Sequence, residues 1–296
     1  MSLDFMPSEA ELLTEAASIA IVRRIQRQAI LTSLTRQAIE TAYVKRGSGS
    51  PVLLLHGFDS SLLEFRYLLP LLAEQHEVWA VDLLGFGFTE RLPEIAVNPA
   101  TIKQHLYAVW QQLFDRPIVL VGASLGGAVA IDFVLTYPHC VSRLVLIDSV
   151  GFSGSFPIGR LLFPPVDYWA ARWLVVRKRA ALRALAAIAP PNLTLIDAIR
   201  CSLLHQAMPG WDESIISFTK SGGYANLSQR MAQISHPTLV LWGEHDDVLR
   251  IDDAGKFERA IANSQLTWIK QSGHTPHLER PQTSAEVILS FSREDL

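Results

Sequence analysis

The stretch that decides the fold is Ile118–Gly127, which reads I-V-L-V-G-A-S-L-G-G. Its first four residues form an apolar run rich in β-branched side chains, which predicts a buried strand. The next five, Gly122–Gly126, fit the pattern G-x-S-x-G, in which the serine occupies a sharp turn from strand to helix. Small neighbours let the backbone double back there and leave the hydroxyl exposed. We therefore take Ser124 as the candidate nucleophile.

The residues that follow the turn favour this interpretation. Ala128–Leu135 is small and apolar, as in a helix packed on a sheet, and Pro138 marks its end. Because a pattern with three fixed letters also arises by chance, a buried serine in a glycine-rich turn is the alternative. The combination of strand, turn and helix supports the nucleophile.

Length and composition indicate a large, apolar α/β domain. The chain has 296 residues, of which 49% are hydrophobic and 19% charged. Its net charge of -3 argues against general binding of nucleic acid. Two cysteines, Cys140 and Cys201, lack metal-ligand spacing and are too few for a disulfide framework, so we expect no metal or other cofactor.

The sequence also bears on location. It has no apolar run of about 18 residues and no basic segment followed by an apolar one at its N-terminus. We expect neither a transmembrane helix nor a secretory signal. The expected location is the cytoplasm or the periphery of a membrane.

The N-terminal segment, residues 1–42, is predicted to be helical. Over residues 8–42 apolar side chains recur at spacings of three and four, and Ser8 with Glu11 resembles a capping box. Such a helix packs on the domain or lies at a membrane interface. In the second case four arginines would contact lipid phosphates: Arg23, Arg24, Arg27 and Arg36.

Several further apolar runs predict strands, and the loops at their ends carry polar side chains. The predicted strands cover residues 43–46, 51–55, 77–81, 143–147, 237–242 and 265–269, with helices over 62–75 and 101–114. The strand 51–55 runs into His56-Gly57-Phe58-Asp59. A backbone N–H of this loop, that of Phe58, is expected to join the N–H of Leu125 in holding an oxyanion. His56 is expected to brace the loop through hydrogen bonds.

An acid and a base follow the last two strands. Asp246 has G-x-x-D spacing after one of them, and His274 follows a glycine after the other. A histidine takes the proton of a serine hydroxyl, and a carboxylate orients the imidazole. For the acid, the neighbouring Asp247 and Asp148 at another strand end stay open as alternatives. For the base, His277 is the alternative to His274. We expect His277 instead to support the loop.

Residues 151–230 interrupt the alternation of strands and helices. They contain six prolines, predicted helices over 167–189 and 193–206, and nine basic against four acidic residues, a charge of +5. An insertion at this point lies above the carboxyl ends of the strands, where ligands bind in open α/β sheets. We interpret it as a helical lid on a core of residues 43–150 and 231–296. One cluster combines cations with an aromatic, as at a lipid surface or a solvated face: Arg172, Trp173, Arg177, Lys178 and Arg179.

With these motifs together, residues 43–291 resemble the α/β-hydrolase superfamily. A closer resemblance, to chlorophyll dephytylases of the cyanobacterial type, is carried by motifs outside the catalytic residues. They are His56–Ser61 with Glu64, Arg66 and Tyr67, then Asp82-x-Leu84-Gly85-x-Gly87-Phe88, Ala128–Asp132 and Ser217-Phe218-x-x-Ser221-Gly222-Gly223-Tyr224. The resemblance implies an α/β-hydrolase fold: a mostly parallel central sheet flanked by helices, with a helical lid inserted after the strand that follows the nucleophile turn.

The same resemblance implies a reaction. It is hydrolysis of the phytyl ester of chlorophyll to chlorophyllide and phytol at or near thylakoid membranes, with Ser124, Asp246 and His274 as the triad. An apolar ester of this size requires an apolar site, for which the predicted lid offers Phe163, Trp169, Trp173 and Trp211. A general carboxylesterase or lipase-like hydrolase is the alternative, and a ligand-binding receptor that keeps the hydrolase fold is a third interpretation.

Overall fold

The computed structural model describes residues 5–155, 159, 161, 163–187, 193–225 and 227–293. Its centre is an eight-stranded sheet in the order β1-β2-β4-β3-β5-β6-β7-β8. β2 pairs antiparallel with β1 and β4, and the pairs from β4 through β8 are parallel. The strands are β1 Gln26–Ile30, β2 Ile39–Arg46, β3 Pro51–Leu55, β4 Glu77–Val81, β5 Ile118–Ala123, β6 Val141–Ile147, β7 Thr238–Gly243 and β8 Ser264–Ile269. Each strand predicted from an apolar run is confirmed, with ends that differ by at most a few residues.

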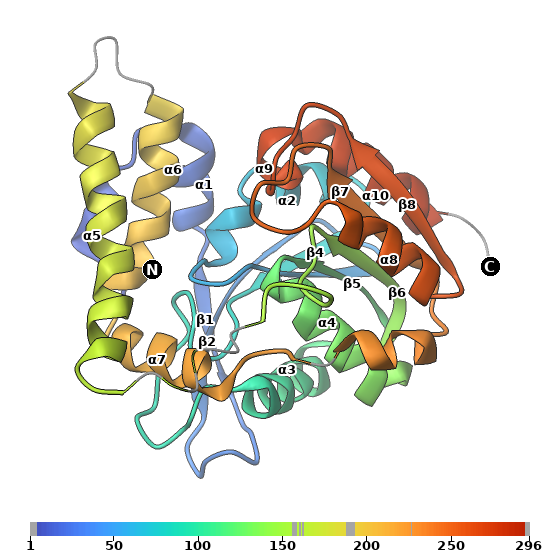
Figure 1. Ribbon diagram of the computed structural model, residues 1–296, viewed down its shortest axis with the longest axis horizontal. Helices are drawn as coiled ribbons and strands as arrows, with labels where there is room; N and C mark the ends of the chain where they lie inside the picture. The colour runs from blue at the N-terminus through green and yellow to red at the C-terminus, as the bar shows by residue number, and fades with distance from the viewer. Residues whose placement is uncertain are drawn as a thin grey trace.

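Helices cover both faces of this sheet (Figure 1). One apolar cluster joins the sheet to α3, α4 and α8, and a second joins its other face to α1, α2 and α10. The helices are α1 Ala16–Val22, α2 Leu68–Leu72, α3 Pro99–Leu113, α4 Leu125–Thr136, α5 Val166–Ala186, α6 Leu193–Leu204, α7 Trp211–Ser221, α8 Asp252–Ala260, α9 Pro276–Glu279 and α10 Pro281–Arg293. Because both faces are covered, β3, β5 and β7 are buried along their whole length.

The prediction of one helix over residues 8–42 is wrong. A 3-10 turn, η1 Ser8–Leu12, precedes the short α1, and the chain then forms the edge strand β1 and enters β2. The expected capping box is absent, since the hydroxyl of Ser8 donates to Glu9. The guanidinium of Arg27 donates to the carbonyl of Phe88, within the domain. Pairing with β2 overrides the helical spacing of this segment.

The predicted helix over 62–75 is also divided. Its first turn is η2 Leu62–Phe65, a 3-10 helix, and α2 follows after a break.

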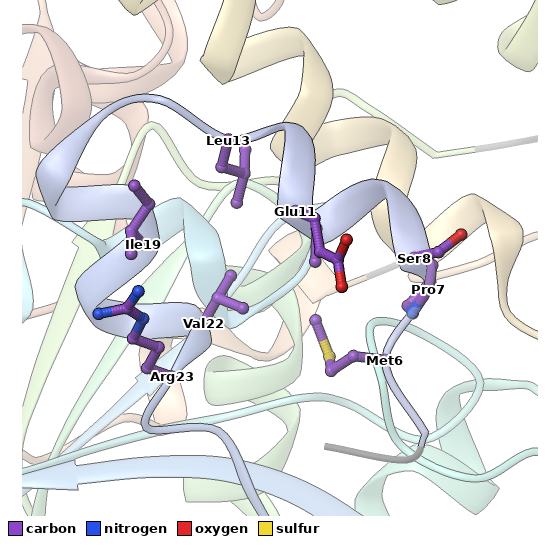
Figure 2. Close-up of a pocket in the computed structure, with 9 residues that line it drawn as sticks. Met6, Pro7, Ser8, Glu11, Leu13, Ile19, Val22 and Arg23 are labelled. Atoms are coloured by element: carbon purple, nitrogen blue, oxygen red, sulfur yellow. The ribbon is translucent and has the colours of Figure 1, made fainter. Parts of the chain in front are cut away.

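A hollow of about 420 Å³ lies beside the N-terminal segment (Figure 2). Its lining comes from η1, α1 and the residues around them, with Met6, Leu13 and Val22 on its apolar side and Glu11 and Arg23 on its polar side. None of these residues belongs to the strand ends that carry the predicted site.

Helices α5, α6 and α7 lie between β6 and β7 in the sequence, and we call them the helical insertion. Figure 1 shows α5 and α6 side by side beyond the edge of the sheet, with α7 below them. The predicted helices over 167–189 and 193–206 correspond to α5 and α6, while residues 188–192 lie outside the described part of the chain. Within the described residues, no helix combines the length and the apolar composition needed to cross a bilayer.

Candidate active site

Ser124 occupies the turn between β5 and α4, in a backbone conformation that few residues adopt. Its φ is 51° and its ψ is -115°. The neighbouring glycines make this turn possible. A Cβ on Gly122 would lie 2.2 Å from the carbonyl oxygen of Gly126, and one on Gly126 would lie 2.0 Å from that of Leu55. The small residues of the motif therefore allow α4 to start directly against β3 and hold the serine at the sheet edge.

The structure brings His274 and Asp246 to this serine from two other strand ends. His274 Nε2 lies 3.1 Å from Ser124 Oγ, and His274 Nδ1 lies 3.0 Å from both carboxylate oxygens of Asp246. Burial raises the pKa of Asp246, but hydrogen bonds from His274 and from the N–H groups of Val248 and Leu249 outweigh it and lower the pKa overall. The carboxylate therefore stays ionised and can orient the imidazole.

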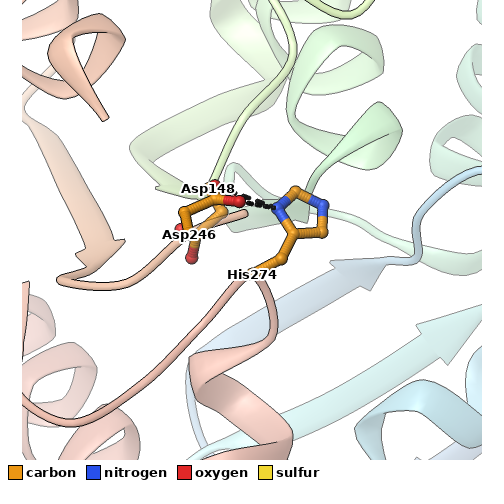
Figure 3. Close-up of side chains that lie close together, drawn as sticks. All are labelled: Asp148, Asp246 and His274. Atoms are coloured by element: carbon orange, nitrogen blue, oxygen red, sulfur yellow. Dashed lines mark hydrogen bonds and ion pairs between the residues drawn. The ribbon is translucent and has the colours of Figure 1, made fainter. Parts of the chain in front are cut away.

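Neither of the two alternative acids binds the histidine. Asp247 is exposed, whereas Asp148 is buried at the end of β6 and accepts a hydrogen bond from the N–H of Gly243. Figure 3 shows Asp148 beside Asp246 and His274, with the dashed bonds of the histidine running to Asp246. Burial raises the pKa of Asp148 to about 9, against the effect of the Gly243 bond and with the charge of Asp246 adding to it. Asp148 is therefore protonated near neutral pH.

These three side chains are also the described residues whose arrangement resembles a metal site. Their ligand atoms lie within 4.8 Å of one another. However, Asp148 is held in its neutral form and Nδ1 of His274 already binds a carboxylate. A neutral acid and an occupied imidazole nitrogen do not make a favourable ligand set for a cation.

The loop His56–Asp59 lies against the serine. A Cβ on Gly57 would come within 3.3 Å of Ser124 Cβ, so the absence of a side chain allows this close approach. His56 braces the loop, since its Nδ1 bonds the carbonyl of Gly57 and its Nε2 accepts from the N–H of Leu83. Leu125 is the first residue of α4. Of the two residues expected to supply oxyanion N–H groups, Leu125 thus directly follows Ser124, and Phe58 directly follows the glycine that approaches it.

Glu64 joins this loop to the one that carries His274. One carboxylate oxygen accepts from the N–H of Gly57 at 3.0 Å, and the other lies 2.9 Å from His277 Nε2. Burial raises the pKa of Glu64, but the bonds and charge of His277 outweigh it and lower the pKa to about 2. His277 thus links the two loops, while His274 is the histidine that bonds Ser124.

Asp59 is a residue of the site that sequence reasoning missed. It is buried, with a positive φ of 49°. Its carboxylate accepts from Lys178 Nζ at 2.8 Å, Gln206 Nε2 at 2.7 Å and Trp211 Nε1 at 3.1 Å. We call these four residues the Asp59 cluster. We call the loop His56–Asp59 the oxyanion loop, after the N–H group that Phe58 is expected to supply. Because Asp59 directly follows Phe58, the cluster ties this loop to the helical insertion. The sequence showed only that an acidic residue ends this loop. Its partners come 119 to 152 residues later in the chain.

The four predicted substrate-binding residues lie in different surroundings. Trp211 is buried in the Asp59 cluster, whereas Phe163, Trp169 and Trp173 are each more than half exposed. Lys178, expected to face solvent or lipid, points inward to Asp59.

An apolar hollow of about 180 Å³ does reach the oxyanion loop. Its walls come from Phe58, from Ala170, Ala171 and Leu174 of α5, and from Ile215 and Ile216 of α7, with Asp167, Thr219 and Lys220 beside them. The ring of Phe58 packs against those of Phe86 and Phe218. The hollow therefore connects the helical insertion to the loop beside Ser124.

Comparison with known proteins agrees with this geometry. Residues 52–287 match the model of the alpha/beta hydrolase family. The chain is 34% identical to the alpha/beta hydrolase domain-containing protein VTE7 of Arabidopsis thaliana, over 97% of this chain and 89% of that protein. It is 28% identical to a 2-hydroxymuconate semialdehyde hydrolase of a Pseudomonas species, over 86% and 91% of the two chains.

The fold is similar to that of a solved thermophilic esterase from Thermogutta terrifontis. The TM-score is 0.75 at 26% identity, with 90% of this chain and 98% of the esterase covered. The family match covers most of the chain, and the mostly parallel sheet flanked by helices is the fold that the resemblance implied. This chain is a member of the alpha/beta hydrolase family.

Proposed function

We propose that the protein is a serine esterase that cleaves the phytyl ester of chlorophyll or of a chlorophyll derivative. The observation that carries the reaction is the hydrogen-bonded series Ser124, His274 and Asp246 beside the loop that contains Phe58. The substrate class is supported by the apolar hollow at Phe58 and by the resemblance of Ser217–Tyr224, at the end of the helical insertion, to chlorophyll dephytylases.

In this mechanism the hydroxyl proton of Ser124 passes to His274 Nε2 while Oγ attacks the ester carbonyl. The N–H groups of Phe58 and Leu125 hold the oxyanion. As the C–O bond of the ester breaks, the imidazolium of His274 gives its proton to the departing alcohol, phytol. A water molecule, deprotonated by His274, then attacks the acyl-enzyme and releases chlorophyllide with Ser124 protonated again. Asp246 stabilises the imidazolium in both halves.

The helical insertion acts as the lid in this proposal. A phytyl chain has about 20 carbons, and its burial at about 0.8 kcal/mol for each methylene is large enough to drive binding. The hollow between α5 and α7 ends at Phe58 and offers walls of alanine, leucine and isoleucine side chains. An enzyme acting on chlorophyll would work at the thylakoid membrane.

The test is to incubate the purified protein with chlorophyll a or pheophytin a in mild detergent and to separate the pigments by chromatography. We expect chlorophyllide or pheophorbide with the unmodified protein and none with Ser124→Ala. If neither pigment is cleaved while p-nitrophenyl esters are, the protein is a general carboxylesterase. That second candidate is favoured by the similarity to a solved esterase over nearly its whole length. Binding of pigment without turnover would indicate a receptor.

A further inference from the structure

Helix α5 presents a row of large apolar side chains to solvent. Trp169, Trp173 and Val176 are 64%, 56% and 61% exposed. Their spacing of four and three residues places them along one line of the helix. Ala171 and Val175, on the opposite side, are buried. We call Trp169, Trp173 and Val176 the apolar row of α5.

Arginines flank the apolar row on both sides. At 100° per residue, Arg177 falls on one side of the row, and Arg172, Arg179 and Arg183 fall on the other. All four are exposed. The guanidinium of Arg177 lies 4.9 Å from the ring centre of Trp173, and Arg172 also bonds Asp212 of α7. The acid of α5 itself, Asp167, is buried and paired with Lys220, so it does not reduce the charge of this face.

This combination points to one kind of partner. In a symmetric contact between two copies, the same arginines would face one another and repel. An anionic lipid surface instead neutralises them, while indole rings favour the boundary between headgroups and acyl chains. The helix is too highly charged to cross a bilayer and suits a position in the interface. We propose that the outer face of α5 docks on a lipid bilayer that contains anionic headgroups.

Docking at this face gives the substrate a short route, a step that rests on the proposed ester hydrolysis. Ala170, Ala171 and Leu174 of the same helix line the apolar hollow that ends at Phe58. With α5 in the interface, the hollow lies behind the same helix, roughly one helix diameter (~10 Å) from the bilayer. A long-chain alcohol group can then leave the bilayer and enter the site while little of it is exposed to water.

The experiment is co-sedimentation of the full-length protein with phosphatidylcholine vesicles that contain or lack phosphatidylglycerol, at low and high salt. We expect binding to the anionic vesicles that weakens as salt rises. The double variant Trp169→Gln/Trp173→Gln should bind about tenfold or more weakly, because two indoles no longer enter the interface. Trp268→Gln removes another exposed indole, on β8, and should bind like the unmodified protein. Arg177→Gln and Arg183→Gln should each weaken binding about fivefold.

Several outcomes would overturn the docking proposal: no vesicle binding, equal loss in the Trp268 variant, or a lipid-independent dimer that the double variant dissociates. Thermal unfolding, monitored by circular dichroism, checks that the double variant is folded. Ser124→Ala should bind vesicles like the unmodified protein while losing ester hydrolysis. Failure of docking and failure of the proposed reaction are therefore recognised separately.

Discussion

The sheet core and the helical insertion position the site by different means. In the core, Ser124, Asp246 and His274 stand just beyond strand ends, and the backbone hydrogen bonds of the parallel sheet fix where those ends lie. The insertion reaches the site through side chains, chiefly the Asp59 cluster. The positions of Ser124, Asp246 and His274 thus depend on the continuous backbone hydrogen bonding of the sheet. The position of the oxyanion loop depends on a few buried polar contacts. Four predictions test this difference, beginning with the largest effect.

Removing the nucleophile tests the core. Ser124→Ala should lower kcat on the order of 10^6-fold, because the histidine then has no hydroxyl to activate. Stability should hardly change, since the ladder on either side of residue 124 stays intact. Steady-state kinetics with a soluble ester and thermal unfolding measure both quantities. A residual kcat near that of the unmodified enzyme would show that another residue is the nucleophile. The strand ends would then not hold the reacting groups.

Breaking the Asp59 cluster tests the insertion. Asp59→Ala leaves the charge of Lys178 in a mostly buried position, which should cost about 3 kcal/mol of stability. The neighbouring N–H of Phe58 should move, and kcat should fall about ten- to a hundredfold with little change in KM.

The double variant Asp59→Asn/Lys178→Met is the matched control for that change. It removes the unpaired charge and should recover most of the stability. If Asp59→Ala keeps full kcat, the insertion does not position the loop, and the comparison with the core fails.

The third prediction concerns Asp148, a core group that the sheet holds in its neutral form. Its pKa in the folded protein is about 9, against 3.8 ordinarily. Between these values the unfolded chain has lost the proton that the folded one keeps, so stability falls as pH rises through this window. Asp148→Asn cannot ionise and should lack that slope. Its free energy of unfolding should exceed that of the unmodified protein by a few kcal/mol at about pH 8 and match it near pH 4.

Thermal or denaturant unfolding across this pH range measures the difference. Asn also keeps an oxygen for the N–H of Gly243. A variant that is less stable at alkaline pH would show that Asp148 is ionised in the fold.

The smallest effect is expected at the far end of the insertion. Asp197 of α6 accepts from the N–H groups of Thr14 and Glu15, just before α1, and so joins the insertion to the N-terminal segment. Asp197→Ala should cost about 1–3 kcal/mol of stability, as loss of hydrogen bonds to a charged group does. The activity should stay within about twofold, because none of these contacts reaches the Asp59 cluster. A large loss of kcat would mean that the insertion acts on the site as one rigid body.

The sequence predicted the core better than the insertion for a physical reason. Strands such as β5 are apolar on both faces, and residues that follow strand ends must meet at one edge, so Ser124, Asp246 and His274 were found from local patterns. The strand Gln26–Ile30 was not predicted. It is a mostly exposed edge strand, so it has no apolar run, and it is held by pairing with β2. The role of Asp59 was missed for the same reason, since Lys178 and Trp211 approach it only in the folded chain.

The Asp59 cluster also bears on the order of events during synthesis. The first 150 residues contain Ser124, the oxyanion loop and most of the sheet, but the partners of Asp59 lie between residues 178 and 211 and His274 is made last. A chain still emerging from the ribosome therefore has its nucleophile without its base and its loop without its anchor. The proposed ester hydrolysis therefore cannot begin until His274 has been synthesised and the partners of Asp59 have folded against the loop.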